Sequence, residues 1–90
     1  MDRHFDHMAE TFASETDVAR MKKLFSEIFT ESEIHDFSLR WGLLEKLSQG
    51  MSQREIASTL GISLCKITRG SKFLKNKNSE LYKIFSSTEE

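Results

Sequence analysis

Apolar residues recur at helical spacing in the first half of the chain. One series steps by three or four residues: Val18, Met21, Phe25 and Ile28. This spacing puts the four side chains on one face and predicts a helix over about residues 17–29. Residues 1–16 show only weak periodicity, so a flexible tail or a frayed helix is expected there.

The next apolar segment predicts a central helix. Thr30 and Glu33 form a capping box at its start, and Gly50 can end it in a left-handed conformation. Its apolar residues fall on two sides, with Ile34, Phe37, Trp41 and Leu44 on one and Leu39, Leu43 and Leu47 on the other. A helix that is apolar on two sides is expected at the centre of the fold or in a dimer interface.

Residues 51–75, MSQREIASTLGISLCKITRGSKFLK, have the spacing of a helix-turn-helix. Ser52 and Glu55 form a second capping box. Gly61 supplies the positive φ of the turn, and Ser63 can cap the helix that follows. The buried stripe consists of Ile56, Leu60, Ile62 and Ile67, with the small Ala57 where the helices cross. The motif is predicted over about residues 52–72.

Gly70 interrupts the buried stripe of the second motif helix. It lies three residues after Ile67, where an aliphatic side chain would continue the stripe. A glycine inside a helix costs roughly 1 kcal/mol relative to alanine. Either the helix ends early, or something other than a side chain fills the gap, and Arg69 offers a charged group beside it.

The composition supports an all-α fold. The 90 residues include no proline and a single valine, which leaves little for strands. Seven Phe, one Trp and four Met are a large apolar supply for so short a chain, and a second copy of the chain can bury it, which predicts a homodimer. We expect one helical domain over residues 17–90, with a short last helix around residues 81–85.

Charge is distributed unevenly along the chain. Residues 1–50 hold six Lys/Arg against ten Asp/Glu, whereas residues 51–90 hold seven against four. Five cations between residues 63 and 79 face no acid: Lys66, Arg69, Lys72, Lys75 and Lys77. Together with the helix-turn-helix spacing, this basic segment indicates that the second motif helix binds DNA. A helical pair used only for packing, with a solvated basic face, is the alternative.

The remaining side chains indicate no further chemistry. No nucleophile with its base, no paired carboxylates and no phosphate loop is evident, so an enzyme is not expected. His4 and His7 have metal-ligand spacing, but nothing completes a site, so neither a metal nor a prosthetic group is expected. The lone Cys65 fits a reducing compartment such as the cytoplasm, and it serves either as a DNA-facing contact or as a redox switch. No apolar run is long enough for a membrane span.

The segments MSQRE, ITRGS and LK, in this order over about residues 50–75, resemble the bacterial tryptophan repressor family. Members of that family are all-helical, intertwined homodimers that use L-tryptophan as corepressor. The ligand wedges between the core and the recognition helices and sets their spacing for double-stranded operator DNA. The resemblance implies a transcriptional repressor that acts on genes of tryptophan metabolism.

The resemblance also implies a ligand site around Arg69. Arg69 matches the arginine that receives the carboxylate of the amino acid, and Gly70 matches the glycine beside the indole. If one residue is deleted just after Gly50, Arg40 matches a second arginine, whose guanidinium plane covers the ring. Without the deletion, Leu39 falls at that position.

The ammonium group of the ligand is implied to lie across the dimer interface. Thr30 matches the threonine at a helix start there, and the backbone carbonyls before it, those of Ile28 and Phe29 among them, help to hold the ammonium. Phe73 stands where the family has a serine that also helps, and phenylalanine has no hydroxyl. Either backbone carbonyls hold the ammonium alone, or the ligand is posed differently, or it is not tryptophan.

On the DNA side, the resemblance implies contacts from both motif helices. Gln53 and Arg54 match phosphate-facing positions at the start of the first. In the second, Leu64, Cys65, Lys66 and Thr68 match the operator-facing surface. Ser63 and Lys72 are expected to contact DNA as well, from the polarity and the basic charge of this helix. Lys66 replaces a threonine of the family. A helix-turn-helix regulator with no effector or a different one, with Arg69 as a phosphate contact, stays open, as does a helical protein-interaction module.

Overall fold

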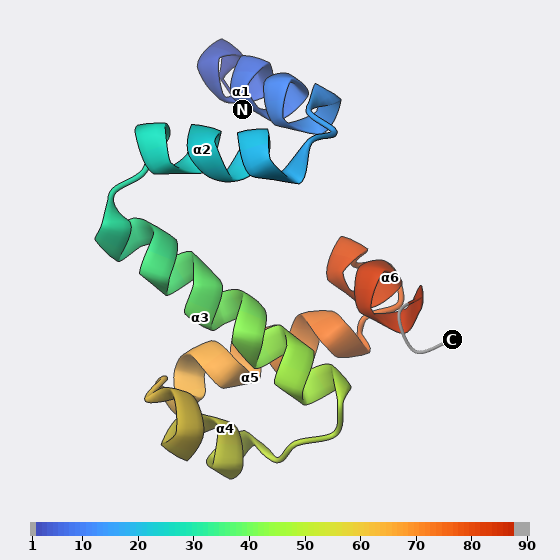
Figure 1. Cartoon of the computed structure of the whole chain (residues 1–90). Coiled ribbons are helices and arrows are strands. Elements are labelled where there is room, and N and C mark those ends of the chain that lie inside the picture. Colours follow the sequence, from blue (N-terminus) through green and yellow to red (C-terminus); the bar gives the residue numbers. More distant parts are fainter. Residues whose placement is uncertain (1, 88–90) are drawn as a thin grey trace. The chain divides into compact units, whose positions relative to one another are not determined.

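A computed structural model of the chain describes residues 2–87, which form six helices and no strand (Figure 1). The helices are α1 (Arg3–Ser14), α2 (Val18–Ile28), α3 (Glu31–Ser48), α4 (Gln53–Leu60), α5 (Leu64–Lys75) and α6 (Glu80–Ser87). The predicted all-α class is confirmed. The intertwined homodimer stays a prediction. Residue 1 of the expected tail and residues 88–90 of the expected domain lie outside the described residues.

The chain divides into two compact units, Met1–Ile34 and His35–Glu90. In the first unit, the segment expected as a flexible tail or a frayed helix forms α1, which continues as far as Ser14. Asp2 caps this helix, since its Oδ1 accepts a hydrogen bond from the Phe5 N–H at 2.9 Å. The Phe12 ring lies 5.0 Å from the Phe25 ring of α2. A cap and an aromatic contact therefore stabilise this helix.

The start of α3 has the predicted capping box. The Thr30 N–H donates to Glu33 Oε1 at 2.9 Å, and the Glu33 N–H donates to Thr30 Oγ1 at 3.1 Å. Both orphan amide groups at this helix start are thus satisfied by side chains. At the other end of α3, Gly50 has a φ of 91°, in the left-handed region that ends helices.

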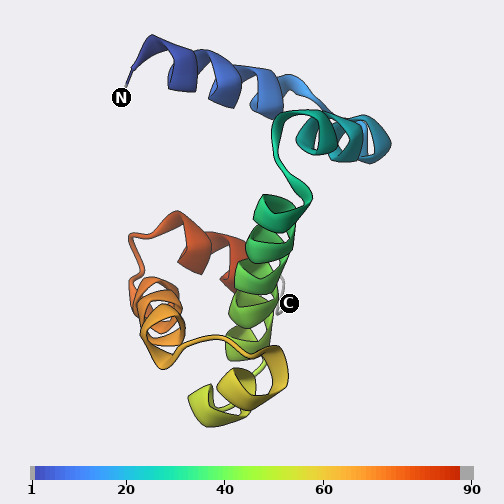
Figure 2. The ribbon, with the colours of Figure 1, turned by 90° about the vertical axis from the view of Figure 1, so that its left-hand side faces the viewer.

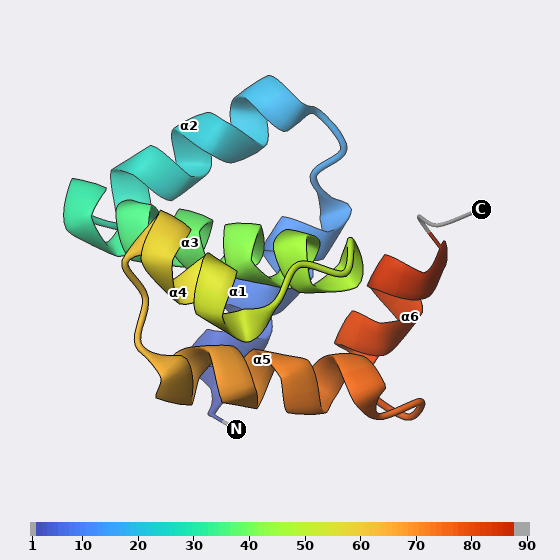
Figure 3. The same ribbon diagram turned by 90° about the horizontal axis from the view of Figure 1, so that it is seen from below.

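In the second unit, α4 and α5 form the predicted helix-turn-helix (Figure 3). Gly61 ends α4 with a φ of 65°, and its N–H donates to the Ala57 carbonyl at 2.9 Å. Ser63 then caps α5. The second motif helix does not end at Gly70, because α5 continues to Lys75.

The core of the second unit lies where α4 and α5 meet the C-terminal part of α3 (Figure 2). Ile56 and Ile67 are fully buried, and Leu43 and Ile62 complete the cluster. Gly70 lies against the leucines of α3, since a Cβ atom at this position would lie 3.2 Å from Leu44 Cδ2. The gap in the apolar stripe is therefore filled by side chains from another helix.

Replacing Gly61 by alanine is expected to lower the free energy of unfolding by about 1 kcal/mol, because an L-residue in the left-handed region is strained. Urea denaturation at fixed protein concentration measures the change. Ser58→Ala, at an exposed position inside α4, is the control and should shift stability by less than about 0.5 kcal/mol. Equal stability of the Gly61→Ala variant and the unchanged chain would contradict the left-handed turn.

Candidate functional site

A cavity of about 520 Å³ opens between α3, α5 and α6 of the second unit. Its lining residues are Arg40, Leu43, Leu44, Lys66, Arg69, Gly70, Phe73 and Leu81. Two arginines from different helices thus reach one cavity, together with the glycine of α5. Leu39 does not line this cavity and packs against the core cluster instead. This placement supports the sequence register that has one residue deleted after Gly50.

The cavity is electropositive above an apolar floor. Its three charged residues, Arg40, Lys66 and Arg69, are all cations, and no acid lines it. Neither arginine forms an ion pair with an acidic residue of the described part of the chain. The guanidinium carbon of Arg69 lies 5.3 Å from the centre of the Phe73 ring. Such a lining suits an anion that carries an apolar body.

Three leucines that line the cavity, Leu43, Leu44 and Leu81, were not predicted as site residues. Leu43 and Leu44 follow Arg40 by three and four residues, so they share its helix face, and this spacing could have identified them. Leu81 is contributed by α6 and has no local signal.

Three of the predicted ligand-site residues lie in the first unit. The Thr30 hydroxyl accepts the Glu33 N–H at the start of α3. Ile28 is the last residue of α2 and is 49% exposed, and Phe29 directly follows it. None of the three lines the cavity, so their part in a ligand site stays a prediction.

The DNA-facing residues expected from the sequence lie on the outer surface of α4 and α5. Seven are exposed: Arg54, Ser63, Leu64, Cys65, Lys66, Thr68 and Lys72. Gln53 is half-buried, and its Oε1 accepts a hydrogen bond from the Thr68 hydroxyl at 3.4 Å. Ile67 faces the opposite way and is fully buried. One helix, α5, therefore presents a basic surface outward and a cavity wall inward.

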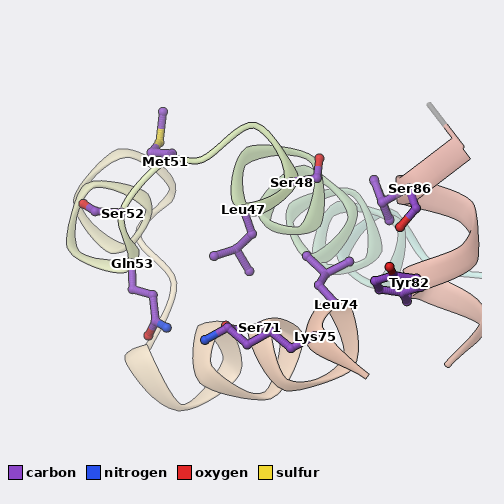
Figure 4. A pocket seen from close by; sticks show the side chains of 11 residues that line it. Leu47, Ser48, Met51, Ser52, Gln53, Ser71, Leu74, Lys75, Tyr82 and Ser86 are labelled. Atoms are coloured by element: carbon purple, nitrogen blue, oxygen red, sulfur yellow. The ribbon is translucent and has the colours of Figure 1, made fainter. Parts of the chain in front are cut away.

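A second cleft, of about 480 Å³, lies between the end of α3, the start of α4, α5 and α6 (Figure 4). Its lining includes Ser71, which is 7% exposed, and the side chains of Lys75 and Tyr82. Gln53 lines this cleft, but Arg40 and Arg69 do not. The cleft therefore does not coincide with the site predicted from the sequence.

Residues 2–87 contain neither a candidate membrane-spanning helix nor a candidate metal cluster. Within this range, no helix is both long and apolar enough to cross a membrane. The same residues contain no cluster of three or more His, Cys, Asp or Glu side chains that could hold a metal ion.

The fold and its exposed basic helix define a helix-turn-helix DNA-binding protein. The family model for the Trp repressor protein matches residues 3–89, so the chain belongs to the Trp repressor family. This is a family of regulatory DNA-binding proteins, not of enzymes. The resemblance predicted from residues 50–75 is confirmed, and the match extends over both units.

Curated relatives agree with the family model. The Trp operon repressor homolog of Vibrio parahaemolyticus serotype O3:K6 is 32% identical over 77 residues, which cover 84% of this chain and 75% of that protein. The homolog of Xylella fastidiosa strain M23 is 44% identical over 59 residues, or 64% of each chain. The homolog of Chlamydia trachomatis serovar D is 41% identical over 56 residues, which cover 61% of this chain and 60% of that protein. No solved structure matches the chain significantly.

Proposed function

We propose that the protein is a transcriptional repressor that binds operator DNA as a homodimer and uses L-tryptophan as corepressor at genes of tryptophan metabolism. The observation that carries this proposal is the cavity in which Arg40 of α3 faces the same space as Arg69 and Gly70 of α5. The names of the relatives, Trp operon repressor homologs, support the choice of ligand.

In the proposed complex, the carboxylate and the indole of the amino acid have partners in the cavity. The Arg69 guanidinium receives the carboxylate through charge-assisted hydrogen bonds. Arg40 approaches from α3 and covers a face of the indole. Gly70 lets the ring approach the backbone of α5, above the leucines of the floor. The ammonium group is held across the dimer interface, by backbone carbonyls of residues 28 and 29 near Thr30 of the second copy of the chain.

Ligand binding is coupled to DNA binding through α5. The inner wall of the cavity and the outer basic surface belong to the same helix, so a ligand between α3 and α5 fixes the orientation of the DNA-facing residues. The helix has two orientations, one that fits DNA and one that does not. A ligand that binds the first more tightly than the second raises operator affinity by the ratio of its two affinities. In a two-fold dimer the paired helices must match successive major grooves, about 34–36 Å apart.

The DNA contacts are divided between the two motif helices. Gln53 and Arg54 at the start of α4 contact phosphates and fix the register of the protein on the duplex. The exposed residues at the start of α5, Leu64, Cys65, Lys66 and Thr68, face the base edges. Bound operator then excludes the polymerase from the promoter.

A gel-shift assay on the promoter of the protein's own gene, with and without L-tryptophan, tests this function. We expect a shifted complex that tightens when tryptophan is added and weakens steeply with salt, because phosphate contacts release counterions. A protein-interaction module would give no complex even at low salt. Calorimetry measures tryptophan binding directly. An absence of heat at millimolar tryptophan would contradict the proposal that tryptophan is the corepressor.

One observation favours a second candidate, a helix-turn-helix repressor with a different anionic effector. The cavity lining contains three cations and no acid, and Phe73 supplies a ring rather than a hydroxyl. An ammonium group therefore has no side-chain acceptor in the lining. The two assays together distinguish this candidate. It predicts no heat when tryptophan is added in the calorimeter, and a gel-shift complex with the operator that does not depend on tryptophan.

A further inference from the structure

Arg69 and Phe73 form a pair on the cavity-facing side of α5. They are four residues apart, which puts them on one helix face one turn from each other. The guanidinium carbon lies 5.3 Å from the ring centre, within the range of a cation–π contact. Both side chains line the same cavity.

In the described part of the chain, the one side chain found to contact the Arg69 head group is the Phe73 ring. Arg69 is exposed, and neither of the two ion pairs there involves it. A free arginine side chain samples many rotamers, and binding a carboxylate would have to order it. Phe73 has only two side-chain torsions and is about a third exposed, so its ring is a stiffer surface than the arginine itself.

We infer that Phe73 is a positioning residue for the ligand site: its ring holds one face of the Arg69 guanidinium, so that the N–H edge stays free to receive a carboxylate. The inference rests on the proposed function in one respect, that Arg69 receives the carboxylate of the ligand. The ring acts through Arg69, and its benefit is preorganisation of that side chain before the ligand arrives.

A purely apolar role for Phe73 makes a different prediction. An apolar wall needs volume but no π face, so leucine would replace phenylalanine without loss. A cation–π role needs the aromatic face, so tyrosine would serve and leucine would not. The pair Phe73→Leu and Phe73→Tyr therefore separates the two roles at one position.

Calorimetry of the full chain with L-tryptophan is the first measurement. We expect Phe73→Leu to weaken binding about two- to fivefold, which is the size of a partly exposed cation–π contact. Phe73→Tyr should keep the affinity of the unchanged chain. Equal affinities of the Leu variant and the unchanged chain would overturn the inference. Far-ultraviolet circular dichroism confirms that each variant folds.

The NMR chemical shift of the Arg69 Nε–H proton in the ligand-free protein is the second measurement. A ring above the guanidinium shifts this proton upfield, and the shift should survive in Phe73→Tyr and disappear in Phe73→Leu. If the unchanged chain gives no tryptophan heat but shows this shift, the tryptophan assignment fails and the positioning role is supported. If the Arg69 Nε–H proton of the unchanged chain shows no upfield shift, the positioning role of Phe73 is overturned, whether or not tryptophan binding gives heat.

Discussion

Arg69→Ala is expected to abolish the tryptophan dependence of operator binding and to leave a folded protein. The side chain is exposed and forms no ion pair in the described residues, so its removal leaves no buried charge without a partner. Hydrogen bonds to a charged group are worth about 1.5–3 kcal/mol, so tryptophan affinity should fall roughly ten- to a hundredfold. Calorimetry and the gel shift with added tryptophan measure the two effects.

Lys72→Ala is the matched control for this variant. Lys72 is an exposed cation on the same helix, but it does not line the cavity. Its removal should weaken operator binding in both the presence and the absence of tryptophan, and should make the salt dependence shallower. The ligand dependence should stay. An Arg69→Ala variant that behaves in the same way as Lys72→Ala would make Arg69 a phosphate contact and would place the ligand site elsewhere.

Helices α3, α4 and α5 could be predicted from sequence because their signals are local. Thr30 and Ser63 cap helices within three residues of themselves, and Gly61 adopts a positive φ at the turn. Residues 1–16 were predicted only as a tail or a frayed helix, because the ring that Phe12 contacts is Phe25 of α2, thirteen positions further along the chain. Periodicity describes one helix face and says nothing about what covers it.

The site was predicted less completely than the fold. A register shift of one residue turns a side chain about 100° around a helix, so the sequence could not choose between Leu39 and Arg40 without an assumed deletion. The structure puts Arg40 at the cavity and Leu39 against the core cluster. Ile28 and Thr30 can join the site only if another segment or another copy of the chain approaches the cavity. No local sequence pattern contains that information.

Gly70 shows why a local reading of the sequence gives an incomplete answer. The sequence shows that a glycine inside a helix lowers helix stability. It does not show which contacts offset that loss. The compensation lies in α3, whose side chains approach the backbone of α5 so closely that a Cβ atom would be 3.2 Å from Leu44 and 3.4 Å from Leu43. The glycine thus serves packing between helices and, in the proposed function, access to the ligand.

Gly70→Val is therefore expected to impair both stability and ligand binding. The Cβ atom alone would already require Leu44 to move by a few tenths of an ångström, and valine adds two methyl groups beyond it. Overpacking of this kind costs typically about 1–3 kcal/mol in the free energy of unfolding. The same methyl groups intrude on the floor of the cavity. Urea denaturation and tryptophan calorimetry measure the two losses.

Gly42→Ala is the control for Gly70→Val. It removes a helical glycine without causing a steric clash. Gly42 lies inside α3, and a Cβ atom there would meet only Leu60 Cδ1, at an ordinary 3.9 Å. Alanine should therefore stabilise the protein by up to about 1 kcal/mol through helix propensity alone, with tryptophan binding unchanged. If Gly70→Val matched the unchanged chain in stability and in tryptophan heat, α3 would not approach α5 as closely as the structure has it, and the cavity between these helices could not be the ligand site.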